Sequence, residues 1–370
     1  MSAPVLYAVG GGKGGVGKSV VAIALAQALA ARSQRVIIVD LDLGAANLHT
    51  YLGVRGPTPT LADVLTRKAT HLADVRVGTS IPGVELISGA EYLPGMANLA
   101  HATKLKLLRH LQTLPADAVV LDLGAGVTFN TLDFFAAANH GVVVTAPEPA
   151  AVMNAYGFIK SALFRQLQRV FRRHESIGAL IEEQARRTDA ERELTLGWMR
   201  QQLQELAPDD LPLLDEVAAS LRLPLVVNRA DGERVPAVIQ NLMSLCRTQL
   251  GLTLDTPLML PDIPAIRRRG WDIPAVLAGD EGRNLQQRMQ EWLGRYVDGP
   301  LPDIDGVRQD YNDADIAQLQ QVLDRLDDFV YAGSNRRSWK LRLYFKPVDV
   351  VQFLLRQGVK DPEFLDIIVR

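Results

Sequence analysis

The residues best suited to chemistry lie near the start of the chain, in a glycine-rich segment. The pattern G-x-x-x-x-G-K-[ST] is satisfied by Gly12-Lys13-Gly14-Gly15-Val16-Gly17-Lys18-Ser19. In this pattern glycines let backbone N–H groups turn inward around phosphates, Lys18 reaches the β and γ phosphates, and Ser19 offers its hydroxyl to Mg²⁺. A helix that begins here directs its positive end at the same anion. The segment from Gly12 to Val20 therefore predicts a phosphate-binding loop.

Carboxylates follow two apolar runs that the predicted fold brings beside this loop. Asp40 and Asp42 come after Val36–Val39, and their spacing of two puts them on the same side of a strand end. A divalent cation and an attacking water must be held at such a place. Asp122 ends a second apolar run, where an acid is costly unless it is exposed or paired, and a Mg²⁺ shell supplies a partner. We therefore expect Ser19, Asp40, Asp42 and Asp122 to surround the metal, and the residues alone leave the separate roles of Asp40 and Asp42 open.

The second lysine of the loop, Lys13, gives the motif a family likeness. The string KGGVGKS resembles the signature of the MinD/ParA ATPases, and residues 5 to about 297 are similar to the flagellar-number regulator branch of that family, FlhG or FleN. The resemblance implies that Lys13 reaches across a homodimer interface to the partner's ATP. It also implies that Asp42 positions the hydrolytic water, while Asp40 helps to hold Mg²⁺ through water.

Other loops resemble the same branch. The segment Asp122–Gly126 looks like its second carboxylate loop, and the segment holding Glu148 and Asn154 resembles the loop near its dimer interface. Asn228 resembles the asparagine that reads adenine, although an asparagine at a strand end is often a turn residue. Pro261 and Asp262 resemble the loop that closes over the base.

Alternation of strands and helices positions these residues. We expect strands at Val5–Val9, Val36–Val39, Val84–Ile87, Val119–Leu123, Gly141–Thr145, Leu225–Asn228 and Thr256–Leu260, with helices at Ser19–Ala31 and Arg283–Val297. Because the strand runs are nearly all apolar, they fit a parallel sheet that helices cover on both faces. The prediction is an α/β, doubly wound, mostly parallel sheet of the P-loop NTPase type.

The sequence predicts a chain of three parts: an ATPase domain, a linker and a small extension. The ATPase domain spans residues 1–298 and contains a helical insertion at about 165–221. A long helix at Ala151–His174 runs into the insertion, and helical segments at Ile177–Ala207 and Leu213–Leu221 follow, with breaks at Pro208 and Pro212. Residues 299–305 form a Pro- and Gly-containing linker. Residues 306–370 are expected to be a small α+β extension, in which Trp339–Phe345 alternates apolar and basic side chains.

Composition narrows the function. The formal net charge of −2 does not indicate binding to nucleic acid or anionic lipid, so such binding would depend on local patches of basic residues. The single cysteine, Cys246, is expected in the core and cannot alone hold an iron–sulfur cluster, which argues against a metallocluster carrier. The first residues lack the features of a signal peptide, and no apolar run reaches the roughly 20 residues that a membrane-spanning helix needs. We therefore expect a cytoplasmic protein, with peripheral association at the membrane or the cell pole as a possibility.

Several functional readings remain open. The first is a slow, partner-activated ATPase whose ATP-bound dimer positions a cellular structure such as a flagellum. The second is a partitioning ATPase that binds DNA nonspecifically through a stripe of Lys160, Arg165, Arg169, Arg172 and Arg173 or through Arg267–Arg269, although such stripes are usually solvated, paired helix faces. A catalytically weak nucleotide-sensing adaptor is the third. The last residues, Pro362–Arg370, are too short and acidic for a clear membrane anchor.

Overall fold

Apolar strands build a central sheet in the computed structural model, which describes residues 3–43, 46–55, 58–89, 99, 101–171, 175–186, 195–220, 223–230 and 235–296. The strands are β1 (Val5–Gly10), β2 (Val36–Leu41), β3 (Val77–Gly78), β4 (Val84–Ile87), β5 (Ala118–Leu123), β6 (His140–Thr145), β7 (Leu225–Val227) and β8 (Leu258–Met259). Their order is β3-β4-β2-β5-β1-β6-β7-β8, and within this sheet only the β3–β4 pair is antiparallel. The predicted doubly wound α/β fold is confirmed.

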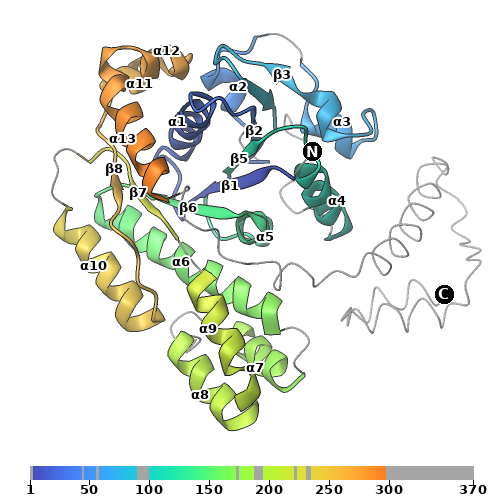
Figure 1. Ribbon diagram of the computed structural model, residues 1–370, viewed down its shortest axis with the longest axis vertical. Helices are drawn as coiled ribbons and strands as arrows, with labels where there is room; N and C mark the ends of the chain where they lie inside the picture. Colours follow the sequence, from blue (N-terminus) through green and yellow to red (C-terminus); the bar gives the residue numbers. More distant parts are fainter. Residues whose placement is uncertain are drawn as a thin grey trace, which may run out of the picture. The chain divides into compact units, whose positions relative to one another are not determined.

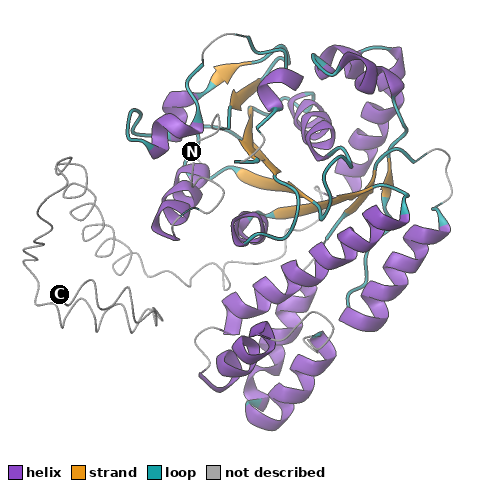
Figure 2. Ribbon diagram, turned by 180° about the vertical axis from the view of Figure 1, so that it is seen from behind, coloured by secondary structure: helices purple, strands orange, loops and turns teal. Residues whose placement is uncertain are grey.

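Helices cover both faces of the sheet (Figures 1 and 2). The described helices are α1 (Lys18–Ala30), α2 (Leu48–Tyr51), α3 (Leu61–Leu65), α4 (His101–Gln112), α5 (Phe129–Ala137), α6 (Pro149–Val170), α7 (Glu175–Arg186), α8 (Leu196–Leu206), α9 (Leu211–Ser220), α10 (Ala237–Leu245), α11 (Pro264–Arg269), α12 (Ile273–Ala278) and α13 (Asp280–Tyr296). Short 3₁₀ segments lie at Leu72–Val75 and Pro208–Asp210, and a π-helical turn lies at Cys246–Leu250.

The central strand β1 contributes to two separate cores. Leu6 and Ala8 belong to the apolar cluster that includes α4, α5 and α6. Tyr7 and Val9 belong to the cluster that includes α1, α12 and α13. Successive strand residues point to opposite faces, so a run that is apolar at every position is what a sheet covered on both sides requires. The resulting rigid sheet fixes the loops at the carboxyl ends of its strands.

The helical insertion is built onto α6. Helices α7, α8 and α9 lie at the end of the described domain that is far from α11 and α12 (Figure 1). Their buried side chains, among them Ile181, Met199 and Val217, belong to the same cluster as Phe158 and Leu167 of α6. The insertion therefore extends the core of the sheet rather than forming a second one.

Most predicted boundaries agree with the structure to within a few residues, with one correction. Pro212 lies inside the first turn of α9, so it does not break the chain there as predicted. Proline is tolerated in the first turn because its missing N–H would have had no helical partner. The helices α2, α3, α4, α5, α10, α11 and α12 and the antiparallel strand β3 were not predicted.

Of the remaining predictions about architecture, the structure confirms some, and others concern residues outside the described ranges. Cys246 is buried, as expected, and burial raises the pKa of its thiol to about 12. No helix in the described ranges is long and apolar enough to cross a membrane. The predicted linker at 299–305 and the extension at 306–370 lie outside the described residues, as do Arg172 and Arg173 of the basic stripe.

Candidate nucleotide-binding site

The predicted site residues converge on one edge of the sheet. Strand β1 lies between β5 and β6, and the loops that follow β1, β2 and β5 carry the glycine-rich segment, Asp42 and Gly124–Gly126. Register places Asp122 of β5 beside both Val9 of β1 and Asp40 of β2. In parallel α/β sheets, ligands bind outside these carboxyl ends, where neighbouring strands send their connections to opposite sides.

Glycine is required at two positions of the loop because other backbone and side-chain atoms approach closely. A Cβ built on Gly12 would lie 2.0 Å from the carbonyl oxygen of Asn154 in α6. A Cβ on Gly17 would lie 2.1 Å from the amide nitrogen of Asn228, and the φ of Gly17 is +93°. Gly17 is also the residue that caps the start of α1. These contacts tie the loop to α6 and β7 and aim the N-terminus of α1 into the site.

Lys18 is the buried cation of the site. The residue is only 8% exposed, and its ammonium donates to the carbonyl oxygen of Lys13 at 3.4 Å. Burial lowers the pKa of Lys18, while the nearby carboxylates of Asp122 and Asp42 oppose that shift. A buried ammonium is stable only with anionic partners, and the phosphates of a nucleotide are suitable ones.

Asp122 lies next to Lys18 and Ser19 and is almost completely buried. The Ser19 hydroxyl donates a hydrogen bond to it, but its Oδ1 has no hydrogen-bond partner among the described residues. Burial, reinforced by the charge of Asp40, raises the pKa of Asp122. A buried carboxylate oxygen without a partner, beside a serine hydroxyl, has the donor chemistry that Mg²⁺ prefers. The residues therefore fit the predicted cation.

Asp40 has a structural task in addition to its predicted one. Its carboxylate accepts backbone N–H groups from Asp42 at 3.1 Å and from Asn47 and Leu48 at 3.0 Å each. Burial raises the pKa of Asp40, and these three hydrogen bonds act against that shift. Asp40 thus holds the loop on which Asp42 lies. The separation of these two acids by two positions in the sequence could not predict this structural role.

Asp42 lies over the loop that follows β5. A Cβ built on Gly124 would lie 3.0 Å from Asp42 Oδ1, so a larger residue there would push the carboxylate away. That loop is tied to the glycine-rich segment, because the N–H of Gly126 donates to the carbonyl of Gly11 at 3.2 Å. Asp42 is partly exposed, unlike Asp40 and Asp122. Of the three acids, it is the one that solvent water reaches.

The residues predicted at a dimer interface are all exposed. Lys13, Glu148 and Asn154 lie at the surface of the single chain: Lys13 in the glycine-rich loop, Glu148 directly before α6 and Asn154 within α6. Asn154 donates to the carbonyl of Ala150 within α6, and Glu148 forms an ion pair of 3.1 Å with Arg229. Lys13 keeps its backbone in the loop while its side chain remains accessible.

The predicted base-binding residues lie at the ends of β7 and β8. The side-chain amide of Asn228 donates to the carbonyl of Val16 at 2.9 Å, so this residue clamps the glycine-rich loop. Its own N–H bonds to Thr145 of β6. Asp262 is paired with Arg267 at 2.6 Å, and Pro261 precedes it on the partly buried loop after β8. A role in base recognition stays a prediction for all three.

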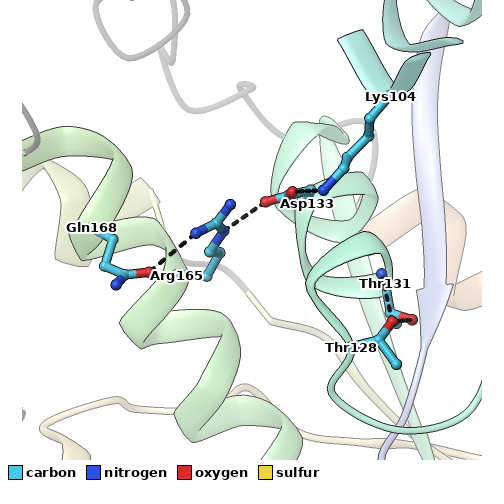
Figure 3. A network of polar contacts seen from close by, with 6 residues as sticks. All are labelled: Lys104, Thr128, Thr131, Asp133, Arg165 and Gln168. Carbon is cyan, nitrogen blue, oxygen red and sulfur yellow. Dashed lines mark hydrogen bonds and ion pairs between the residues drawn. The ribbon is translucent and has the colours of Figure 1, made fainter. Parts of the chain in front are cut away.

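An ion-pair network that sequence reasoning missed joins α4, α5 and α6 (Figure 3). Asp133 of α5 accepts from Lys104 of α4 and, at 2.6 Å, from Arg165 of α6. Arg165 also stacks over the ring of Phe129, and Arg169 donates to the carbonyl of Ala136. For Arg165, the interpretation of the basic stripe as a helix face paired with acidic residues is therefore confirmed, whereas Arg169 is engaged by a backbone carbonyl. Helical spacing alone could not reveal an acidic partner on another helix.

Comparison with known proteins agrees with this geometry. Residues 7–269 match the model of the family described as "CobQ/CobB/MinD/ParA nucleotide binding domain". The antiactivator FleN of Pseudomonas aeruginosa is 36% identical over 157 residues, which are 42% of this chain and 55% of FleN. The flagellum site-determining protein YlxH of Helicobacter pylori is 33% identical over 162 residues, 41% of this chain and 52% of YlxH. The matched relatives also include iron–sulfur cluster carrier proteins.

The solved structures extend the likeness over more of the chain. The septum site-determining protein MinD from Pyrococcus horikoshii, solved with Mg-ADP, superposes with a TM-score of 0.52 at 18% identity and covers 80% of this chain and 98% of that one. At that identity the likeness shows the fold. The chain spans about half the length of the two curated relatives, FleN and YlxH, so their whole activities do not transfer with the match.

Proposed function

The chain belongs to the CobQ/CobB/MinD/ParA nucleotide-binding family, and from this we propose that it is an ATP-dependent dimerisation switch that positions a cellular structure. The observation that supports the proposal most directly is the meeting of Lys18, Asp42 and Asp122 at one sheet edge, beside the exposed Lys13. FleN and YlxH, one of them named for determining the flagellar site, make a flagellum the first structure to consider.

In the proposed reaction the protein holds MgATP and activates water. Loop N–H groups and Lys18 bind the phosphates, and the Ser19 hydroxyl and Asp122 carboxylate would hold Mg²⁺, which neutralises charge on the phosphates. Asp42 orients a water for attack on the γ phosphorus, with ADP as the leaving group and phosphate as the second product. Lys13 lies at the surface, from which its ammonium reaches the nucleotide of a second copy.

This arrangement makes ATP a bridge between two subunits. Hydrolysis removes the γ phosphate that Lys13 of each subunit contacts, and the dimer separates. Turnover is slow without an activating protein partner, and the switch works in the cytoplasm, with its dimer held on a partner or surface. The iron–sulfur carrier function of some relatives is not part of the proposal, because the only cysteine, Cys246, is buried.

A partitioning ATPase that binds DNA nonspecifically is the second candidate. The basic residues of α6 give this candidate little support, because Arg165 pairs with Asp133 and Arg169 donates to the carbonyl of Ala136, both in α5. The inactive adaptor is disfavoured because Asp42 lies beside Gly124, in reach of the phosphate site, as an active switch requires.

The test separates dimerisation from hydrolysis by sedimentation velocity with ATP and with ADP. Asp42→Ala should remain a dimer in ATP because hydrolysis is blocked, whereas Lys13→Ala should remain a monomer while still binding nucleotide. Lys68→Ala removes an exposed lysine that lies elsewhere and pairs with Asp63, and it should behave as the unmodified chain. An Asp42→Ala protein that binds ATP and stays monomeric would refute the switch.

A further inference from the structure

The short loop between β5 and α5, residues 124–128, lies directly against Asp42. A Cβ built on Gly124 would lie 3.0 Å from Asp42 Oδ1, so this carboxylate packs on the backbone of the loop. The N–H of Gly126 donates to the carbonyl of Gly11 at 3.2 Å, which fastens the loop at its β5 end. The position of the Asp42 carboxylate therefore depends on where this loop lies.

The other end of the loop is fixed where α5 begins. Thr128 is the N-cap of α5, and its hydroxyl oxygen accepts from the N–H of Thr131 at 3.2 Å (Figure 3). The first helical residue, Phe129, is 70% exposed, and the guanidinium of Arg165 lies 5.4 Å from the centre of its ring. Because water surrounds most of this ring, burial restrains it little, and the cation–π contact supplies a restraint.

Arg165 reaches this point from α6 and is itself held in place. Its Nε donates to Asp133 of α5 at 2.6 Å, and its Nη1 donates to the side-chain oxygen of Gln168 at 3.2 Å (Figure 3). Phe129 and Asp133 are four positions apart, so they lie on the same face of α5. One guanidinium thus contacts both residues and fastens the first turn of α5 to α6.

Helix α6 is a suitable anchor because it also contacts the glycine-rich loop. The carbonyl oxygen of Asn154 in α6 approaches Gly12 so closely that no Cβ fits between them. The buried residues Phe158 and Leu167 of α6 belong to the core of the sheet, so the helix cannot shift easily. Helix α6 therefore supports the glycine-rich loop directly and, about three turns later, supports the loop after β5 through Arg165.

We propose that Arg165 is a positioning residue for ATP hydrolysis, because it holds residues 124–128 where Asp42 can orient the attacking water. The inference rests on the proposed function and adds to it a residue outside the phosphate loop. Arg165 acts through its contacts with Phe129 and Asp133. Its loss should slow hydrolysis without weakening the binding of ATP, since Lys18 and the glycine-rich loop remain in place to hold the phosphates.

Hydrogen exchange of the nucleotide-free chain tests the clamp without reference to activity. In Arg165→Met, peptides that cover residues 124–128 should exchange about tenfold faster, because a loop with one attachment fewer opens more often. Arg169→Met is the matched control, since Arg169 lies one turn later on α6 and donates to the carbonyl of Ala136 near the other end of α5. Exchange of the loop in this control should stay within about twofold of that in the unmodified chain.

Steady-state hydrolysis, measured well below the unfolding temperature of each variant, tests whether the position of the loop matters for the chemistry. Arg165→Met should lower kcat about tenfold and leave KM for ATP within about twofold, since displacing a reacting group by about 1 Å costs up to about 100-fold in rate. Arg165→Lys keeps a cation beside Asp133 and should recover part of kcat, whereas Arg169→Met should match the unmodified chain. Sedimentation velocity in ATP should show the same dimer for every variant.

The outcomes separate this role from the proposed function. Equal loop exchange in Arg165→Met and the unmodified chain would overturn the proposal, and so would faster exchange with an unchanged kcat. An equal fall of kcat in Arg169→Met would also overturn it, because the loss of any contact between α5 and α6 would then suffice. An unmodified chain that neither dimerises nor hydrolyses ATP would refute the proposed function and this role with it, and the exchange result would still show whether Arg165 holds the loop.

Discussion

Burial of ionisable side chains is the main energetic feature at the scale of single residues. Lys18 and Asp122 are both buried at the same sheet edge, and burial disfavours the charged form of each. The described residues leave Asp122 Oδ1 without a hydrogen bond, a cost that the cation of the proposed function would offset by supplying a partner. The site is thus organised for a ligand rather than for stability.

A buried histidine far from this chemistry makes stability depend on pH. His140 stacks on Tyr7 at 4.9 Å, and burial lowers its pKa to about 4. The unfolded chain has a histidine pKa of about 6.5, so it takes up a proton first as the pH falls. The contribution of His140 to the free energy of unfolding should therefore be complete above a pH of about 6.5 and be lost between there and about 4.

His140→Phe keeps the stacked ring and removes the titrating group. The decline on acidification should be smaller in this variant, by up to about 3 kcal/mol at the acid end, as a shift of about 2.5 pKa units implies. Urea unfolding of both proteins across this pH range measures the difference. Identical slopes in the two proteins would mean that His140 does not titrate as its burial indicates.

At the scale of elements, close backbone contact sets the glycine-rich loop. Gly12→Ala should destabilise the nucleotide-free protein by about 1–3 kcal/mol or more, because its Cβ would meet the carbonyl of Asn154 in the rigid helix α6. Gly14→Ala is the matched control, since the nearest atom to its Cβ is 4.0 Å away. Denaturant unfolding without nucleotide isolates this effect from phosphate binding. Equal stability of the two variants would show that α6 yields to the added methyl group.

Helices α4, α5 and α6 are joined by the network around Asp133. Burial opposes ionisation of Asp133, but the hydrogen bonds from Arg165 and Lys104 outweigh it and lower its pKa. Asp133→Asn should cost about 3 kcal/mol of unfolding free energy, since it leaves the ammonium of Lys104 buried and unpaired.

A double-mutant cycle tests this pair, with Lys104→Met as the second substitution. Combined with Asp133→Asn, it should recover part of the loss, because the uncompensated charge is then gone. Thermal unfolding of the two single variants and the double variant gives the coupling. Additive effects of the two substitutions would contradict a direct interaction.

At the scale of the whole molecule, the insertion and the sheet share one core. Met199 of α8 is completely buried in the cluster that includes α6, while Leu206 of the same helix is 53% exposed. Met199→Ala should cost about 2–5 kcal/mol, and Leu206→Ala should change stability by less than about 0.5 kcal/mol. Because the core is continuous, circular dichroism and nucleotide binding should be lost together on heating. Two separate transitions would show that the insertion unfolds independently.

The sequence by itself determined the fold class and supplied the prediction of the phosphate site. Apolar runs at every position predict strands covered on both faces, and the motif Gly12–Ser19 is recognised from residue types at fixed spacing, so both could be predicted without coordinates. The family likeness of Lys13 and the carboxylates rested on the same short-range patterns. These features depend on residue type and spacing along the chain.

Only the tertiary structure decided how separate segments meet. The clamp of Asn228 on Val16 joins residues 212 positions apart, and the pairing of Arg165 with Asp133 joins two helices. The same holds for Arg55 beside Trp271 and for the N–H groups that Asp40 accepts. Such contacts depend on distances across the fold, and side-chain type predicts that a partner is needed but not which residue the packing supplies.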